Sequence, residues 1–224
     1  PLPTRTQMFG GDRNETLAGF SIVPKDNPTA SDPVRIALAG NAVGRVPDIP
    51  GAVTGSSYYT RYSFTEAGRF KREDASSKYF SDTVDTNVGG LVTDSEGSIY
   101  ITGTVFNSGV VDTSINPVFL TTNRAFEGGR LLRNNDLYVR KYDQAGNLVY
   151  SVLVGGNNNE SIGGLDYNPE GLSNSYGSAI AVDNLGNAYI TGITTSFNYP
   201  RTRGAYGEVF DNNANVVVTK LNSD

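Results

Sequence analysis

The feature that most constrains the fold of this chain is an internal repeat. Residues 90–103 and 178–192 share one pattern, in which a short apolar run, an Asp-x-x-Gly turn and a β-rich run ending on glycine follow each other. This punctuation predicts a β-hairpin in each segment. A looser copy spans residues 20–40, where Pro28 and Pro33 lengthen the turn because prolines favour an extended loop over strand pairing. Self-similarity of this kind indicates one structural unit per copy.

Each hairpin is followed by further strands. Third strands are predicted at residues 58–64, 137–142 and 216–221. In the second copy, an Asp-containing turn leads into a fourth strand at residues 148–154, which Gly155 and Gly156 close. Four antiparallel strands in one unit are typical of a propeller blade. The sequence therefore predicts an all-β fold of three four-stranded antiparallel propeller-type blades.

The two ends of the sequence match complementary parts of the repeat. Residues 221–224 align with residues 142–145, so the third copy breaks off just before its outer strand. Residues 1–11 align without a gap with residues 146–156, which contain that strand in the second copy. We therefore predict that the N-terminal strand supplies the outer strand of the last blade, with another subunit as its donor.

The repeat pattern divides the chain into four parts. The complementing strand occupies residues 1–11, two blade-like repeats occupy residues 12–87 and 88–156, and a last repeat without its outer strand occupies residues 157–224. Within the last repeat, residues 160–176 are rich in Gly, Ser and Asn and are interpreted as an insertion between blades. Insertions in repeat proteins decorate one face of the fold, where they can bind partners.

Several segments also resemble a known family. The residues that carry the likeness lie at 148–156, 179–192, 199–202 and 218–222. They resemble the repeat of bacterial and archaeal surface β-propellers that is usually called SBBP. The likeness is good over roughly residues 88–224 and holds only in outline for the first copy. The resemblance implies a propeller fold in a secreted or surface-displayed protein, and it implies no catalytic residues.

Composition excludes several classes of protein. The net charge of -5 disfavours a nucleic-acid partner, because phosphate binding requires clustered Lys and Arg. The sequence has no run of about 18 apolar residues, so we predict no membrane span. The chain starts at Pro1 without a signal peptide, which we interpret as a processed or trimmed form of an extracellular or cell-surface protein.

The chain contains neither histidine nor cysteine. This excludes a Ser-His-Asp triad, a Cys-His dyad, a disulfide and any thiolate or imidazole metal site. The acidic residues Asp94, Asp143 and Asp183 lie in predicted hairpin turns, where Asp is favoured. We therefore predict a protein that is not an enzyme and has no cofactor. A carboxylate pair across a central channel is the catalytic alternative that stays open.

Segments rich in Asn and Asp allow two interpretations. Residues 157–160 with Asp166, and residues 211–213, hold oxygen atoms of the type that calcium binds. Because no Asp-x-Asp-x-Asp-Gly loop is present, and because Asn and Asp also favour ordinary loops, we predict no metal site. Asn14 and Asn159 each begin a glycosylation sequon at the same repeat position and are the candidate glycosylation sites.

Three blades do not complete a circle, because closed propellers have about four to eight. An open arc leaves a strand edge exposed, and such edges attract partners. Three arrangements are open: residues 1–11 complete a blade of another copy, the chain is a piece of a larger closed propeller, or the strand folds back onto its own chain. The match between the two ends favours the first. We predict a structural protein that is its own partner and assembles head to tail into an extracellular filament or tube.

The alternative function is a cell-surface module that binds a carbohydrate or protein ligand as part of a larger closed propeller. In that interpretation, tyrosines such as Tyr58, Tyr59 and Tyr138 form a binding site whose aromatic rings stack against the sugar rings of surface glycans. The competing interpretation places the same tyrosines in the core between blades, because alternating apolar residues on strands pack against neighbouring strands.

The predicted interface consists of a donor and an acceptor strand. The donor residues are Thr4, Arg5, Thr6, Gln7, Met8 and Phe9, and the acceptor residues are Val216, Val217, Val218, Thr219, Lys220 and Leu221. Pairing of the two strands forms about six backbone hydrogen bonds, which stabilise the interface by roughly 0.5–1.5 kcal/mol each. Association itself costs about 4–15 kcal/mol, so these bonds need support from buried side chains. Burial of Leu2, Met8 and Phe9 adds roughly 1.5–3 kcal/mol each, and we expect apolar blade faces to contribute as well.

Overall fold

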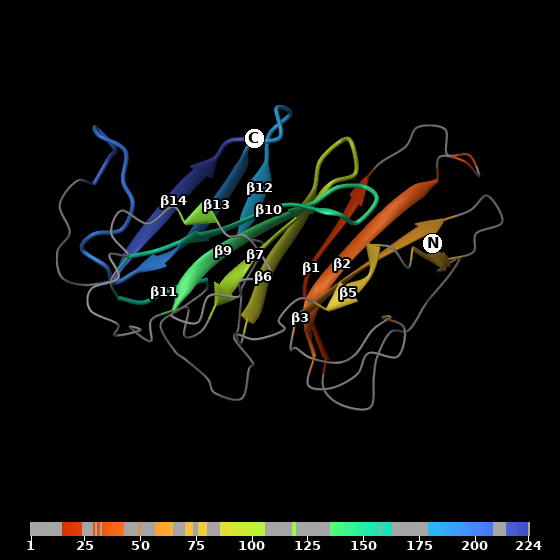
Figure 1. Cartoon of the computed structure of the whole chain (residues 1–224), viewed down its shortest axis with the longest axis horizontal. Helices are drawn as coiled ribbons and strands as arrows, with labels where there is room; N and C mark the ends of the chain where they lie inside the picture. Colours follow the sequence, from red (N-terminus) through yellow and green to blue (C-terminus); the bar gives the residue numbers. More distant parts are fainter. Residues whose placement is uncertain are drawn as a thin grey trace, which may run out of the picture.

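The computed structural model describes residues 15–23, 29, 31, 33–42, 49, 57–64, 70–73, 76–79, 86–105, 118–119, 135–156, 158–162, 179–207 and 214–223. This part of the chain forms strands and contains no α-helix. The strands form three sheets, which lie side by side in sequence order (Figure 1) and none of which closes on itself. The predicted all-β class is therefore confirmed.

The first sheet is built from β1 to β5. Its three long strands are β1 (Glu15–Val23), β2 (Val34–Ala42) and β3 (Ser57–Phe64), which pair antiparallel in this order. The short strands β4 (Phe70–Arg72) and β5 (Lys78–Tyr79) both pair with β3. Together they share its second edge, because β2 occupies the whole of the first.

The second sheet is built from β6 to β10. Strands β6 (Thr86–Thr93), β7 (Ile99–Val105), β9 (Asp136–Tyr142) and β10 (Leu148–Val154) pair antiparallel in this order. A two-residue strand, β8 (Val118–Phe119), pairs parallel with the outer edge of β10. The four predicted strands of the second copy are thus present in the predicted order.

The third sheet is built from β11 (Glu160–Ser161), β12 (Ile180–Val182), β13 (Ala188–Thr194) and β14 (Asn215–Leu221). Because β14 pairs along the whole of one edge of β13, β11 and β12 share the other edge. Residues 160 and 161 of the predicted insertion form β11, so the insertion begins inside this sheet, and the next described strand after it, β12, pairs with the same edge of β13. The interpretation that it lies between blades is wrong, since the strands that flank it belong to one sheet.

The hairpin turns follow from their Asp-x-x-Gly sequences. Gly97, Gly146 and Gly186 have φ angles of +83°, +85° and +79°, which glycine adopts without the steric cost that other residues bear. In each turn the Asp carboxylate accepts a hydrogen bond from the backbone N–H four residues later, at 2.8–2.9 Å. Side-chain and backbone hydrogen bonds from Asn187 lower the pKa of Asp183 to about 2. These local bonds confirm the turn role predicted for the three aspartates.

Apolar cores lie between neighbouring sheets. The core between the first and second sheets joins Ala37, Ala39 and Tyr59 to Val88 and Leu91. A second core joins the second and third sheets; its members include Leu137, Val139, Ile162, Ile180 and Ile190. Several tyrosines are buried, namely Tyr58, Tyr59, Tyr62, Tyr100, Tyr138, Tyr142 and Tyr199. This confirms the interpretation of Tyr58, Tyr59 and Tyr138 as core residues.

The described residues include no helix that is long and apolar enough to cross a bilayer.

Candidate assembly interface

The predicted acceptor residues, 216–221, form most of β14 at the edge of the third sheet. One edge of β14 pairs along its whole length with β13, from Asn215 opposite Thr194 to Leu221 opposite Ala188. Within the described part of the chain, no strand pairs with the other edge of β14. In the second sheet the equivalent strand, β9, lies between β7 and β10. The third sheet thus presents at β14 the edge that β10 covers in the second sheet.

The side chains of β14 alternate between the two faces of the third sheet. Val216 and Val218 point away from the second sheet and are 76% and 74% exposed. Val217 lies on the opposite face, partly buried against the core shared with the second sheet, and Leu221 is buried. Strand β14 is therefore anchored on its inner face and has exposed valines on its outer face.

Two polar contacts hold β14 in place. The Thr219 and Tyr199 hydroxyl oxygens lie 2.6 Å apart and form a hydrogen bond. The Lys220 ammonium lies over the ring of Tyr189, 5.4 Å from the ring centroid, in the range of a cation–π contact. The strand is thus fixed by side chains as well as by its ladder with β13.

The first sheet presents a second exposed apolar surface at the other end of the described fold. Leu17, Phe20 and Ile22 of β1 are 59%, 60% and 46% exposed. Their neighbour Ser21 points the opposite way and hydrogen-bonds Thr93 of the second sheet, with 2.7 Å between the hydroxyl oxygens. The three apolar side chains consequently lie on the face that points away from the second sheet.

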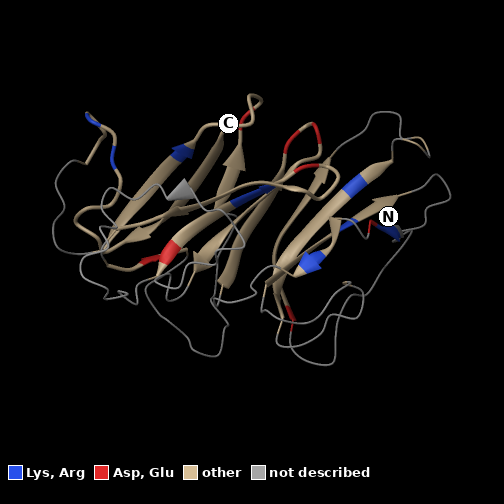
Figure 2. Cartoon of the chain, in the orientation of Figure 1, with Lys and Arg blue, Asp and Glu red and all other residues tan. Residues whose placement is uncertain are grey.

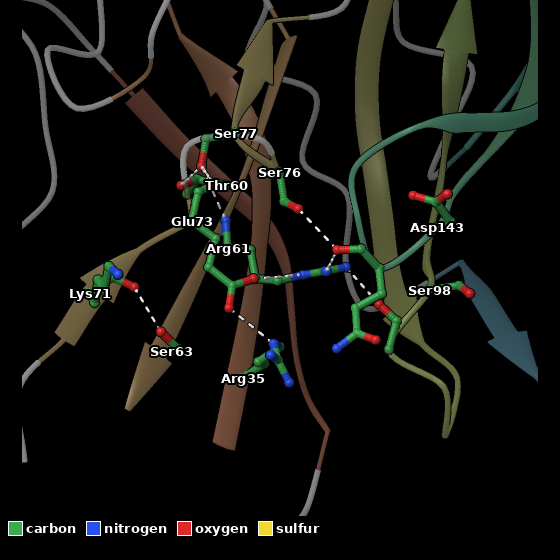
Figure 3. Close-up of polar contacts among 12 residues, drawn as sticks. Arg35, Thr60, Arg61, Ser63, Lys71, Glu73, Ser76, Ser77, Ser98 and Asp143 are labelled. Carbon is green, nitrogen blue, oxygen red and sulfur yellow. Dashed lines mark hydrogen bonds and ion pairs between the residues drawn. The ribbon is translucent and has the colours of Figure 1, made fainter. Parts of the chain in front are cut away.

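A buried arginine shows how adjacent sheets are joined (Figure 3). Arg61 of β3 is 1% exposed, and its guanidinium donates to the carbonyl oxygens of Gly97 and Gln144, at 2.6 and 2.5 Å, in two turns of the second sheet. The Glu73 carboxylate lies 3.8 Å from Nε of Arg61 and accepts a hydrogen bond of 2.9 Å from Nε of Arg35. Burial lowers the pKa of the Arg61 guanidinium, and Glu73 opposes that shift.

A shallow cavity of about 690 Å³ lies beside this junction. Residues of both sheets line it, among them Arg35, Glu96 and Asp143. The charged groups of the lining are mostly acidic, because three carboxylates, those of Glu73, Glu96 and Asp143, stand beside the single guanidinium of Arg35. The positions of charged residues along the described strands are scattered, and Lys and Arg form no continuous run over neighbouring strands (Figure 2).

Two carboxyl groups are fully buried at the contact between the second and third sheets. Glu160 of β11 accepts hydrogen bonds from the Thr194 hydroxyl at 2.6 Å and from the Gly156 N–H at 3.0 Å. Asp136 of β9 is also 0% exposed, and a Cβ atom on Gly155 would collide with both carboxyl groups. Burial raises the pKa of Glu160 to about 7, and repulsion from Asp136 acts in the same direction.

Sequence reasoning missed Arg61 and this carboxyl pair. Arg61 lies among tyrosines, between Tyr59 and Tyr62, in a segment whose pattern is typical of an ordinary strand. The carbonyl groups to which it donates belong to another repeat. Glu160 follows a run of three asparagines, and Asp136 comes just before the strand predicted at residues 137–142. A charge at an inward position of a strand was the one available signal for Arg61.

The Asn-rich segment before β11 is held by hydrogen bonds within the protein. The Asn158 side-chain amide donates to the Thr195 carbonyl at 3.1 Å, and the Asn159 side-chain oxygen accepts from the Asn135 N–H at 3.1 Å. Among the described residues, no three acidic side chains gather into a metal site. Asn159 is exposed, as a glycosylated residue would have to be. Asp166, residues 211–213 and Asn14 lie outside the described residues.

The predicted donor residues Thr4, Arg5, Thr6, Gln7, Met8 and Phe9 also lie outside the described residues. Strand donation therefore stays a prediction, and the structure reports only on the acceptor side.

Comparison with protein-family models and with curated protein sequences finds no match to this chain. The likeness to the SBBP repeat stays a prediction.

Proposed function

We propose that this chain is a structural protein that assembles head to tail by β-strand complementation, with residues 1–11 of one copy pairing with β14 of the next. The observation that carries the proposal is the edge of β14. Strand β14 is the equivalent of β9 in the second sheet, but no described strand pairs with the edge that corresponds to the edge of β9 paired with β10. The three sheets act as propeller-type blades, and the product is an extracellular filament or tube.

The repeat specifies the register of the donated strand. Residues 1–11 align with residues 146–156, and Ser151 of β10 pairs with Arg140, Val152 with Val139 and Val154 with Leu137. Transferred to β14 by the same alignment, Thr6 faces Thr219, Gln7 faces Val218 and Phe9 faces Val216. Cross-strand pairs of apolar side chains contribute roughly 0.2–1 kcal/mol each, so Phe9 beside the exposed Val216 favours this register over its neighbours.

Head-to-tail joining of this kind has two geometric outcomes. If the rotation between copies closes, two chains form a ring of six blades; if it does not, copies add without limit and form a filament. The filament is proposed because the edge of β14, with which no described strand pairs, and two unlike apolar end surfaces both promote continued addition.

The absence of cysteine from the natural sequence allows a direct test by disulfide cross-linking. One preparation carries Thr6→Cys and another carries Thr219→Cys; they are mixed, oxidised and run on a non-reducing gel. The proposal expects a covalent dimer from the mixture, and a ladder of multimers from a chain that carries both substitutions. The matched control replaces Thr6→Cys with Gln7→Cys, which places the thiol one residue out of register and on the opposite face.

The other outcomes each refute the proposal. A disulfide that forms only within the doubly substituted monomer would show that the strand folds back onto its own chain. A mixture that gives no more dimer than the off-register control would show that residues 1–11 do not pair with β14. As an independent check, deletion of residues 1–9 should leave folded protein that forms no multimers, which electron microscopy of the deleted and the full-length chain would measure.

A further inference from the structure

At the two ends of the row of sheets, apolar side chains are exposed at register positions whose described counterparts in the other sheets are buried: Phe20 at one end, and Val216 and Val218 at the other. The equivalences follow from strand register, counted from the glycine near the end of each second strand, which is Gly40, Gly103 or Gly192. On the first strand of each sheet we compare the residue that pairs with the position two before this glycine. On the third strand we compare the residue that pairs with the position one before it.

On the first strand, the compared position faces the preceding sheet. Leu91 pairs with Ile101 and Ile180 pairs with Ile190, each two residues before the glycine. Leu91 is 3% exposed in the core with the first sheet, and Ile180 is 5% exposed in the core with the second. Phe20 occupies the same position in the first sheet and is 60% exposed.

On the third strand, the compared position faces the following sheet. Tyr59 pairs with Ala39, Val139 with Thr102 and Val218 with Thr191, each one residue before the glycine. Tyr59 and Val139 are both 0% exposed, because the second and third sheets cover them. Val218 is 74% exposed, since no described sheet follows the third. Val216 shows the same contrast with its counterparts Leu137 and Ser57.

We infer that these end surfaces bind each other between copies: the outer face of the first sheet, with Leu17, Phe20 and Ile22, packs on the outer face of the third sheet of another copy, with Val216 and Val218. The occupant is a second copy of this chain because Phe20 and Val218 stand at the register positions whose counterparts share a core at both internal junctions, Leu91 with Tyr59 and Ile180 with Val139. This contact adds to the strand donation proposed above and rests on the same head-to-tail order, but it is made by the faces of the two sheets and not by the backbone edge of β14.

The repeat also assigns the contacts within this second interface. At the internal junctions, Leu91 packs in one core with Tyr59, and Ile180 packs in one core with Val139. Between copies, the same relation brings Phe20 of one copy to Val218 of the next. A buried apolar side chain of this size contributes enough to change association by roughly tenfold or more.

The test uses the full-length chain with substitutions at these exposed positions. Phe20→Asp and Val218→Arg are each expected to weaken multimer formation at least tenfold in sedimentation velocity, because each places a charge in an apolar contact. The chain that carries both should recover multimers, since Asp and Arg then face each other at every contact. Leu185→Arg is the matched control: this residue is 78% exposed in a hairpin turn away from both surfaces, and its substitution should change nothing.

The outcomes separate this inference from strand donation. If Phe20→Asp forms multimers as the natural chain does and keeps the Thr6–Thr219 cross-link, the packing of end faces is refuted and strand donation stands. If the cross-link is absent but Phe20→Asp abolishes multimers that the double substitution restores, the end faces bind and strand donation is refuted. If the natural chain sediments only as a monomer, both are refuted. Circular dichroism of each variant establishes that it is folded.

Discussion

Replacement of Glu160 by glutamine should change how stability depends on pH. Burial raises the pKa of this carboxyl from an ordinary 4.5 to about 7 in the folded chain. The folded state therefore holds a proton that the unfolded state releases between these two values, and its contribution to stability is present below about pH 4.5 and is lost as pH rises through about 7.

The size of the effect follows from the difference in pKa. Each unit of difference between the folded and unfolded states is worth about 1.4 kcal/mol, so ionisation of Glu160 is expected to remove about 3 kcal/mol of stability between pH 4.5 and pH 8. Glutamine does not titrate, and it keeps an oxygen that accepts from Thr194. Glutamine also places its NH2 group where the second oxygen of Glu160 accepts a hydrogen bond from the Gly156 N–H. The loss of an acceptor for this backbone N–H is expected to cost roughly 1–3 kcal/mol of stability.

The natural chain should therefore be the more stable of the two at pH 5, and the difference should shrink or reverse at pH 8. Urea unfolding at several pH values between 5 and 9 measures this difference in stability. Tyrosine fluorescence serves as the signal of unfolding, because the chain has no tryptophan. Glu96→Gln serves as the control, since Glu96 is exposed in a turn. Parallel stability–pH curves for the natural chain and the Glu160→Gln variant would refute the assignment of a raised pKa to this group.

Substitutions at two further positions, Arg61 and Gly155, test the contacts between sheets. Arg61→Leu should reduce stability by roughly 3–5 kcal/mol in denaturant unfolding, because Glu73 loses a partner and the Gly97 and Gln144 carbonyls lose their donor; Arg61→Lys should recover only part of this, since an ammonium cannot reproduce the guanidinium fork. An unchanged midpoint for Arg61→Leu would contradict this role. Gly155→Ala should cost at least roughly 1–3 kcal/mol, because the added methyl overlaps the buried Asp136 carboxyl; a thermal midpoint equal to that of the natural chain would contradict the close packing described there.

Much of the secondary structure could be predicted because its causes are local. An Asp-x-x-Gly turn is stabilised by hydrogen bonds within five residues, so the turns that contain Gly97, Gly146 and Gly186 could be predicted from the sequence. The third strands at residues 57–64, 136–142 and 215–221 also agree with their predicted ranges to within one residue.

The contacts between sheets could not be predicted, because their partners are distant in sequence. Arg61 donates to carbonyls 36 and 83 residues away, and backbone carbonyls carry no residue-specific signal. Glu160 and Asp136 meet only because β11 packs beside β9. The interpretation of residues 160–176 as an insertion between blades was wrong for a similar reason, because the pairing of both β11 and β12 with β13 is a property of the sheet and not of the residues between them.

The unlike surfaces at the two ends of the row of sheets have a consequence for growth. A linear assembly joined through them has polarity, because one terminus always displays the aromatic ring of Phe20 and the other always displays the valines of β14. Its two tips would present chemically different docking sites to an incoming subunit, so elongation would proceed at two different rates. A molecule that binds only one tip would stop extension there and leave the opposite tip active.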